Sequence, residues 1–158
     1  MGLDMYLYAG KYLSNYDSAP EDKVLAKAVR KTVGFPIQFP RQGPEGAVNL
    51  KVTVGYWRKV NAVHNWFVEN VQDGVDECRE HYVDREQLSD LQELCTTLLQ
   101  TKDEQAVLEH LPPTEGFFFG PTDIDEYFWS SLEETVEILN RALTLDEQGW
   151  YIHYCSSW

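Results

Sequence analysis

Hydrophobic and polar positions alternate in three stretches of the chain, and this alternation predicts three β-strands. In residues 2–8, Leu3, Met5 and Leu7 lie on one face, while polar and tyrosine side chains lie on the other. A period of two is typical of a strand with one buried face. Two further stretches show the same alternation: residues 48–54 and residues 150–155. A short apolar piece near residues 81–83 predicts one more strand.

Helices are predicted between these strands from apolar spacing of three and four residues. Their expected extents are residues 18–32, residues 56–72, Asp84 to about Leu99, residues 103–110 and residues 122–145. Capping boxes are expected at Ser18–Glu21 and at Asp84–Gln87, where Ser or Asp is followed three residues later by Glu or Gln. The pair Asp73-Gly74 is expected to stop the second helix.

Two segments do not follow either period. Residues 34–46 are rich in proline, glycine and phenylalanine, which predicts a loop that is either functional or an ordered crossing loop held by its aromatic side chains. Residues 116–120 predict either a buried strand or a tight aromatic segment. With no repeat and no linker in between, the order of elements predicts one α+β domain over residues 1–158. In it, about four helices cover a small, mainly antiparallel sheet.

The charge is strongly negative and unevenly distributed. The net charge is −13, and residues 1–60 carry nine Lys/Arg against five Asp/Glu, while residues 61–158 carry four against 21. Such an acidic surface repels nucleic-acid phosphates and anionic membranes, so neither is an expected partner. No apolar run reaches the ~18 residues that a membrane-spanning helix needs. The three cysteines form no Cys-x-x-Cys pair, which is typical of a reducing cytosol.

The known catalytic and cofactor motifs are absent from the sequence. It contains no nucleophile elbow, no phosphate-binding glycine loop and no His-Glu-x-x-His pair, so no cofactor, metal or catalytic residue is predicted. The spacing of Cys78 and His81 is half of a zinc site without a second half.

The densest group of chemically useful side chains lies in residues 55–70. On the predicted helix, Trp57, Asn61 and His64 share one face, and the neighbouring stripe is polar. Such a patch can stack a flat ring on Trp57 and hold an anion with a basic side chain. The alternative is a partly buried helix whose polar groups satisfy nearby carbonyls. The predicted ligand-binding residues are Trp57, Arg58, Lys59, Asn61, His64 and Asn65, with Phe39 and Arg41 closing the site from the loop.

Four segments together resemble a family of small proteins from tailed phages and prophages. They are the opening Met-Gly-Leu-Asp-Met-Tyr-Leu, the Gly-Tyr-Trp-Arg-Lys-x-Asn-x-x-His-x-Trp-Phe-Val segment at 55–68, the Gly-Phe-Phe-Phe-Gly run at 116–120 and the final Ser-Ser-Trp. The resemblance implies an accessory protein of infection, at work in the host bacterial cytoplasm and directed against host defence. It implies no catalytic residue.

Three functions follow as hypotheses. The first is a non-enzymatic binder that sequesters a small anionic, nucleotide-like host ligand, with a homo-oligomer as an open alternative to a monomer. The second is an acidic inhibitor of a host protein, or a mimic of DNA charge, using the acidic run from Glu69 to Asp84. The third is a hydrolase with His64 as general base.

Overall fold

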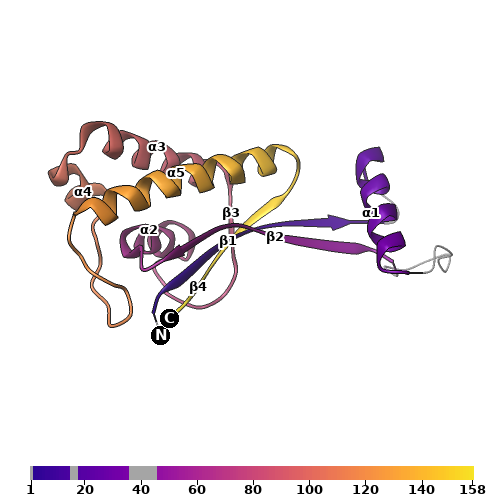
Figure 1. The fold of residues 1–158 in the computed structure, drawn as a ribbon, viewed down its shortest axis with the longest axis horizontal. Helices are drawn as coiled ribbons and strands as arrows, with labels where there is room; N and C mark the ends of the chain where they lie inside the picture. Colours follow the sequence, from indigo (N-terminus) through magenta and orange to yellow (C-terminus); the bar gives the residue numbers. More distant parts are fainter. Residues whose placement is uncertain (1, 15–17, 36–45) are drawn as a thin grey trace. The chain divides into compact units, whose positions relative to one another are not determined.

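The computed structural model describes residues 2–14, 18–35 and 46–158. These residues form four strands and five helices (Figure 1). In chain order the elements are β1 (Asp4–Leu13), α1 (Pro20–Thr32), β2 (Val48–Arg58), α2 (Asn61–Val71), β3 (His81–Val83), α3 (Arg85–Thr101), α4 (Glu104–His110), α5 (Glu126–Glu147) and β4 (Tyr151–Ser157).

The strands form one four-stranded antiparallel sheet in the order β2-β1-β4-β3, which confirms the predicted α+β class. In the pair that β3 makes with β4, Tyr82 lies opposite His153. By its internal contacts the chain divides into two compact units. Unit 1 comprises Met1–Ala9 with Val52–Trp158, and unit 2 comprises Gly10–Lys51. Strands β1 and β2 therefore contribute residues to both units.

Unit 1 has its core on one face of the sheet. The predicted alternation in β1 is confirmed, because Met5 and Leu7 are fully buried while the side chains between them are partly exposed. From the helical side, Phe67 of α2 stacks on Tyr154 of β4 with ring centroids 3.9 Å apart. On the opposite face, Tyr6 of β1 lies 5.3 Å from Tyr56 of β2, ring centre to ring centre.

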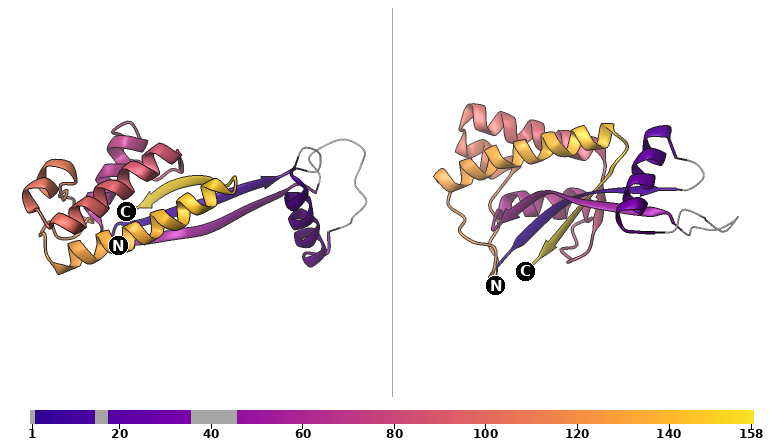
Figure 2. Two further views of the ribbon diagram at one scale, coloured as in Figure 1. Left: turned by 90° about the horizontal axis from the view of Figure 1, so that it is seen from above. Right: turned by 45° about the vertical axis from the view of Figure 1, so that its right-hand side comes forward.

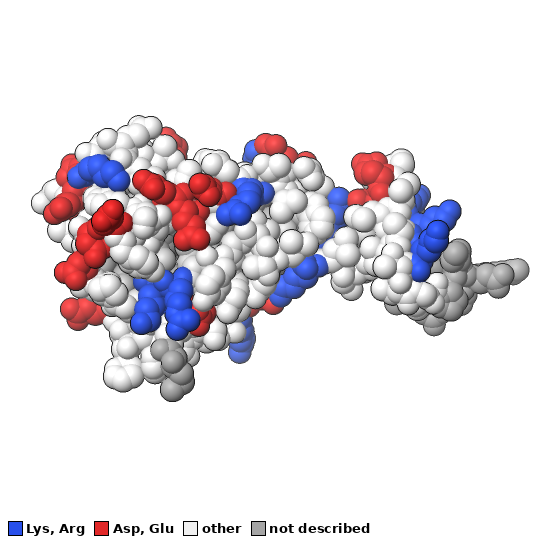
Figure 3. All heavy atoms as spheres, viewed as in Figure 1, with Lys and Arg blue, Asp and Glu red and all other residues white. Residues whose placement is uncertain are grey.

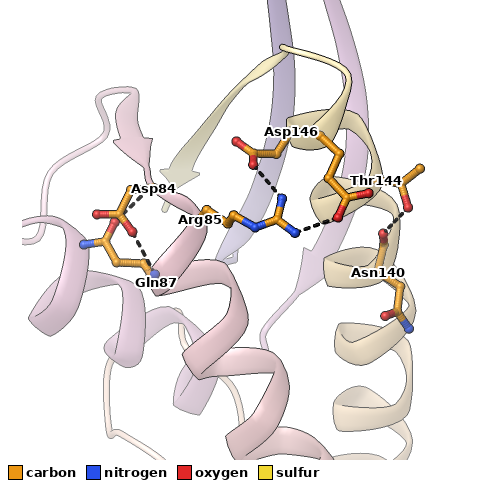
Figure 4. A network of polar contacts seen from close by, with 7 residues as sticks. Asp84, Arg85, Gln87, Asn140, Thr144 and Asp146 are labelled. Atoms are coloured by element: carbon orange, nitrogen blue, oxygen red, sulfur yellow. Dashed lines mark hydrogen bonds and ion pairs between the residues drawn. The ribbon is translucent and has the colours of Figure 1, made fainter.

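Helices α3 and α5 pack side by side in an antiparallel pair (Figure 2). The first residue of α3, Arg85, forms ion pairs with Asp146 and Glu147 at the end of α5, at 3.1 and 2.6 Å (Figure 4). Further along α3, Gln92 donates to Asn140, which comes earlier in α5. The predicted capping box starts α3: Asp84 accepts from the Gln87 backbone N–H, and the Gln87 side chain accepts from the Asp84 backbone N–H. These contacts fix the register of the helix pair.

Unit 2 contains α1 and the adjoining parts of β1 and β2. Lys11 of β1 pairs with Asp22 of α1 at 2.8 Å, and Arg30 donates to the Gly46 carbonyl at 2.7 Å. The predicted capping box at Ser18 is wrong, because its hydroxyl donates back to the Ser14 carbonyl and the N-cap residue is Ala19. In the described part of this unit, only Leu13 and Ala26 are fully buried apolar residues.

Two other boundaries differ from the prediction, those at the start of α2 and of α5, and the structure decides between the alternatives for residues 116–120. The helix expected from Tyr56 begins at Asn61, because β2 continues through Arg58 and the chain then turns at Lys59 with φ 59°. Of the two interpretations of residues 116–120, the structure has the tight aromatic segment: residues 117–119 form a turn, and Phe117 is 95% exposed. The cap of α5 is Asp125, whose carboxylate accepts from the Phe128 N–H, and the expected cap, Thr122, lies before the helix.

Candidate functional site

The junction of β2 and α2 carries most of the residues selected from the sequence. In β2, alternate residues turn toward α5, and Gly55 and Trp57 both do so. A Cβ on Gly55 would lie 2.2 Å from Ile138 of α5, and the Trp57 indole N–H donates to the Thr135 hydroxyl at 2.9 Å. Trp57 is 1% exposed, so its ring belongs to the core and presents no face to a ligand. The structure therefore does not give Trp57 the stacking position expected from a helix.

Arg58 and Lys59 follow at the end of the strand. The Arg58 side chain is 58% exposed and its guanidinium lies 3.9 Å from the Asp4 carboxylate. Tyr127 donates to the Arg58 carbonyl at 2.6 Å, and the Lys59 N–H donates to the Leu3 carbonyl at 2.8 Å. These backbone contacts tie the turn to β1 and α5 and leave the two basic side chains at the edge of the junction.

Asn61 is buried and makes three hydrogen bonds to the connection between α4 and α5. Its amide donates to the carbonyls of Phe119 and Pro121 at 3.2 and 2.8 Å, and its carbonyl accepts from the Thr114 N–H at 3.0 Å. The cleft beside Asn61 and Lys59 has a volume of about 20 Å³, which is room for a single water molecule. Asn61 therefore holds a loop in place, as the alternative interpretation of the sequence expected.

His64 is the centre of a polar chain inside unit 1. Its Nε2 lies 3.2 Å from the Asp76 carboxylate and its Nδ1 lies 2.7 Å from the Tyr154 hydroxyl. Since a carboxylate only accepts, Nε2 carries the proton, so the Tyr154 hydroxyl donates to Nδ1. The second oxygen of Asp76 accepts from the Trp158 indole at 3.1 Å. This chain links α2, the connection after it and β4.

Burial controls the ionisation of this chain. His64 is 1% exposed, and desolvation lowers its pKa below the usual value, although Asp76 acts in the opposite direction. Desolvation, with a smaller effect of the Asp76 charge, raises the pKa of Tyr154 well above its usual value. An Asp-His-hydroxyl order resembles an activated nucleophile. Here, however, the hydroxyl is on a fully buried tyrosine and both imidazole nitrogens are occupied, so the chain stabilises the fold and offers no base to a substrate.

The remaining selected residues lie elsewhere. Asn65 borders a cleft of about 180 Å³ between α2 and the end of α4, together with Trp66, Glu69 and His110. The volume of this cleft is below the ~300–1,000 Å³ of typical small-molecule pockets. The Glu69 carboxylate at its edge would also repel an anionic ligand. Phe39 and Arg41 lie outside the described residues. The structure thus brings Arg58, Lys59 and Asn61 together but does not join Trp57 and His64 to them in one open pocket.

The acidic run between Glu69 and Asp84 is also partly used within the fold. Asp76 bonds His64 and Trp158, Glu77 lies 3.1 Å from His81 and 3.2 Å from Arg79, and Asp84 caps α3. These carboxylates are therefore not a free row of charges. No group of side chains in the described residues could hold a metal ion, and no helix there is long and apolar enough to cross a bilayer.

A second acidic surface, which we call the acidic layer, lies on α3 and α5. It consists of six exposed carboxylates, none of which pairs with a cation of the described residues: Glu86, Asp90, Glu93, Glu133, Glu134 and Glu137. Acidic side chains gather over the helices of unit 1 in Figure 3. The sequence signal for this layer was the spacing of Glu86, Asp90 and Glu93, four and three residues apart on one helix face.

An open groove of about 520 Å³ borders the same part of α5. Its walls come from β2 and from the end of α5: Val52, Thr53, Val54, Asn140, Arg141, Thr144 and Leu145. Sequence patterns do not reveal this groove, because it joins residues more than 80 positions apart. Comparison with protein-family models, curated proteins and solved structures finds no match to this chain. The resemblance to phage proteins therefore stays a prediction.

Proposed function

We propose that this protein is a non-enzymatic binding protein whose acidic layer binds a basic surface of another protein. The observation that carries the proposal is the set of six exposed carboxylates without cationic partners among the described residues. Unpaired carboxylates on packed helices keep their full charge toward solvent. They attract a basic partner over several ångströms and accelerate its association.

The spacing of the carboxylates in the acidic layer suits a basic protein surface. Side chains three or four residues apart on a helix have Cβ atoms about 5–6 Å apart, so each helix presents a row of negative charges. The contacts of Arg85 with Asp146 and of Gln92 with Asn140 fix the register of the two helices, and in this register the acidic row of α5 follows that of α3 along the helix pair. A long row of negative charge is also a feature of DNA, so a DNA-binding protein of a bacterial host is the partner class that fits the phage resemblance.

The hypothesis of small-anion capture has weaker support in the described residues. Its two ring side chains, Trp57 and His64, are each 1% exposed and hydrogen-bonded within the core. The hydrolase hypothesis needs a His64 side chain that a substrate can reach, whereas this side chain is buried.

The proposal is tested with a labelled arginine-rich peptide as the probe. Fluorescence anisotropy should show a Kd that rises at least about tenfold between ~0.05 and ~0.5 M NaCl, because salt screens exposed charges. The Glu133→Gln/Glu137→Gln variant should weaken binding. The control variant, Glu69→Gln/Asp73→Asn, removes the same charge near the end of α2 and should weaken it much less. Equal weakening by both variants, or binding that tolerates salt, would contradict the proposal.

A further inference from the structure

Strand β2 is an edge strand, and α5 covers only part of it. Among the described strands its one neighbour is β1, since the sheet order is β2-β1-β4-β3. Near the end of the strand α5 reaches its backbone, because the Tyr127 hydroxyl donates to the Arg58 carbonyl at 2.6 Å. Further back the strand passes close to α5, where a Cβ on Gly55 would meet Ile138. At Val52–Val54 the space between strand and helix opens into the groove of about 520 Å³.

A groove between a strand edge and a helix suits an extended peptide. One wall is Val52–Val54 and the other is the last part of α5, from Asn140 to Leu145, and all of these residues belong to unit 1. A segment laid along the strand can bond to its backbone while every second side chain turns into the groove. Those side chains would meet Val52, Val54 and Leu145, which favours apolar residues. At ~3.3 Å per residue, this wall accommodates about three or four residues of such a segment.

Arg141 adds one positive charge to the groove. It is the one cation among the lining residues, and neither Asp nor Glu is among them. Its Nε–H donates to the backbone carbonyl of Glu137, and its guanidinium pairs with no carboxylate of the described residues. A guanidinium binds a carboxylate through charge-assisted hydrogen bonds of fixed geometry. A segment that fits the groove therefore carries a carboxylate, either at its C-terminus or on an acidic side chain.

We propose that an extended segment of a partner protein adds to β2 as a further strand at Val52–Val54, with apolar side chains in the groove and a carboxylate on Arg141. A second copy of the chain paired along β2 would also cover the strand edge. However, β2 contains no acidic residue, so self-pairing would bring no carboxylate to Arg141. The inference uses none of the carboxylates of the proposed function and needs no basic partner.

The probe is the peptide Gly-Ser-Val-Thr-Val, labelled at its N-terminus, and fluorescence anisotropy with the full chain gives its Kd. Three forms are compared: one with a free C-terminus, one amidated, and one amidated after an added Asp. The neutral amidated form should bind at least about tenfold more weakly than one of the two carboxylate forms, because it lacks a charged hydrogen bond. The carboxylate form that binds more tightly identifies the source of the carboxylate.

Arg141→Gln tests the cation of the groove. It should raise the Kd of the tighter carboxylate form at least about tenfold and affect the neutral form much less. Arg79→Gln is the matched control, because it removes a guanidinium whose side chain is 79% exposed and which does not line the groove. Circular dichroism checks that both variants keep their helices. Equal binding of the three peptide forms, or equal effects of the two variants, would overturn the inference.

Methylation of the peptide's backbone nitrogens tests the addition of a strand. Alternate N–H groups of a strand point to opposite sides, so only one alternate set can bond to β2. Methylating that set should raise the Kd at least about tenfold, and methylating the other set should change it little. Equal effects of the two sets would overturn the inference, as would decanoate that competes as strongly as the peptide, or a dimer of the chain that excludes the peptide. The Glu133→Gln/Glu137→Gln variant should not weaken binding of this peptide, so this inference and the proposed function are tested separately.

Discussion

Replacing Gly55 with alanine tests why β2 can pass so close to α5. The added Cβ would lie 2.2 Å from Ile138 Cγ2, well inside van der Waals contact, and Ile138 is 1% exposed and branched, so it has little room to move. Forcing one methyl group into a packed core costs about 1–3 kcal/mol, and we expect Gly55→Ala to lower the free energy of unfolding by that amount. Chemical denaturation followed by circular dichroism measures the change.

The double variant with Ile138→Ala makes the test sharper. Ile138→Ala alone should cost about 2–5 kcal/mol, because it leaves a cavity. In the double variant the clashing Cγ2 is absent and the methyl group added at position 55 occupies part of that cavity, so the two effects should fall short of additivity by at least about 1 kcal/mol. Gly2→Ala is the matched control, because the nearest atom to its Cβ would be the flexible end of Lys59, at 3.0 Å, and the other neighbours would lie at 3.8 Å or more. Strict additivity, or a Gly55→Ala variant as stable as the original, would refute the reasoning.

Two other predictions concern buried titratable groups. Since burial lowers the pKa of His64, the unfolded chain binds a proton at about pH 6.5 that the folded chain does not. Stability should therefore fall as the pH drops from about 7 to 5, with a smaller slope in His64→Asn. An equal slope in both proteins, measured by urea denaturation across that range, would exclude His64 as the source. Burial raises the pKa of the Cys95 thiol to about 12, so iodoacetamide at mildly alkaline pH should modify the exposed Cys78 and spare Cys95. Mass spectrometry of peptides from the folded protein checks this, and rapid modification of Cys95 would show that the core opens.

The sequence predicted correctly those features that depend on a few neighbouring residues. The α3 capping box formed as expected, since Asp84 and Gln87 satisfy each other without help from the rest of the chain. The stop at Asp73-Gly74 also formed, with φ of 53° and 75°. The alternation of Leu3, Met5 and Leu7 predicted β1 for the same reason. In each of these cases the determining contacts lie within one turn or one strand.

Boundaries set by distant contacts could not be predicted. Gly55 looks like the end of a strand in the sequence, yet in the structure its missing side chain is what lets the strand continue beside Ile138. Continuing the strand moves Trp57 from a helix face into the core, where Thr135 accepts its N–H. The burial of His64 depends likewise on Tyr154, 90 residues away. The predicted site differs from the observed arrangement because of these long-range contacts.

The strand order has a consequence for how the protein is made. β4 is the last of the four strands in the sequence, yet it lies between β1 and β3 in the sheet. While Tyr151–Ser157 is still inside the ribosome, β1 lacks one neighbour, β3 lacks the strand it pairs with, and Phe67 lacks the ring that stacks on it. The first three strands therefore cannot form the complete sheet until the fourth has emerged. The sheet is completed only after β4 has been synthesised, and the interval before that is when the nascent chain is most exposed to chaperones and proteases.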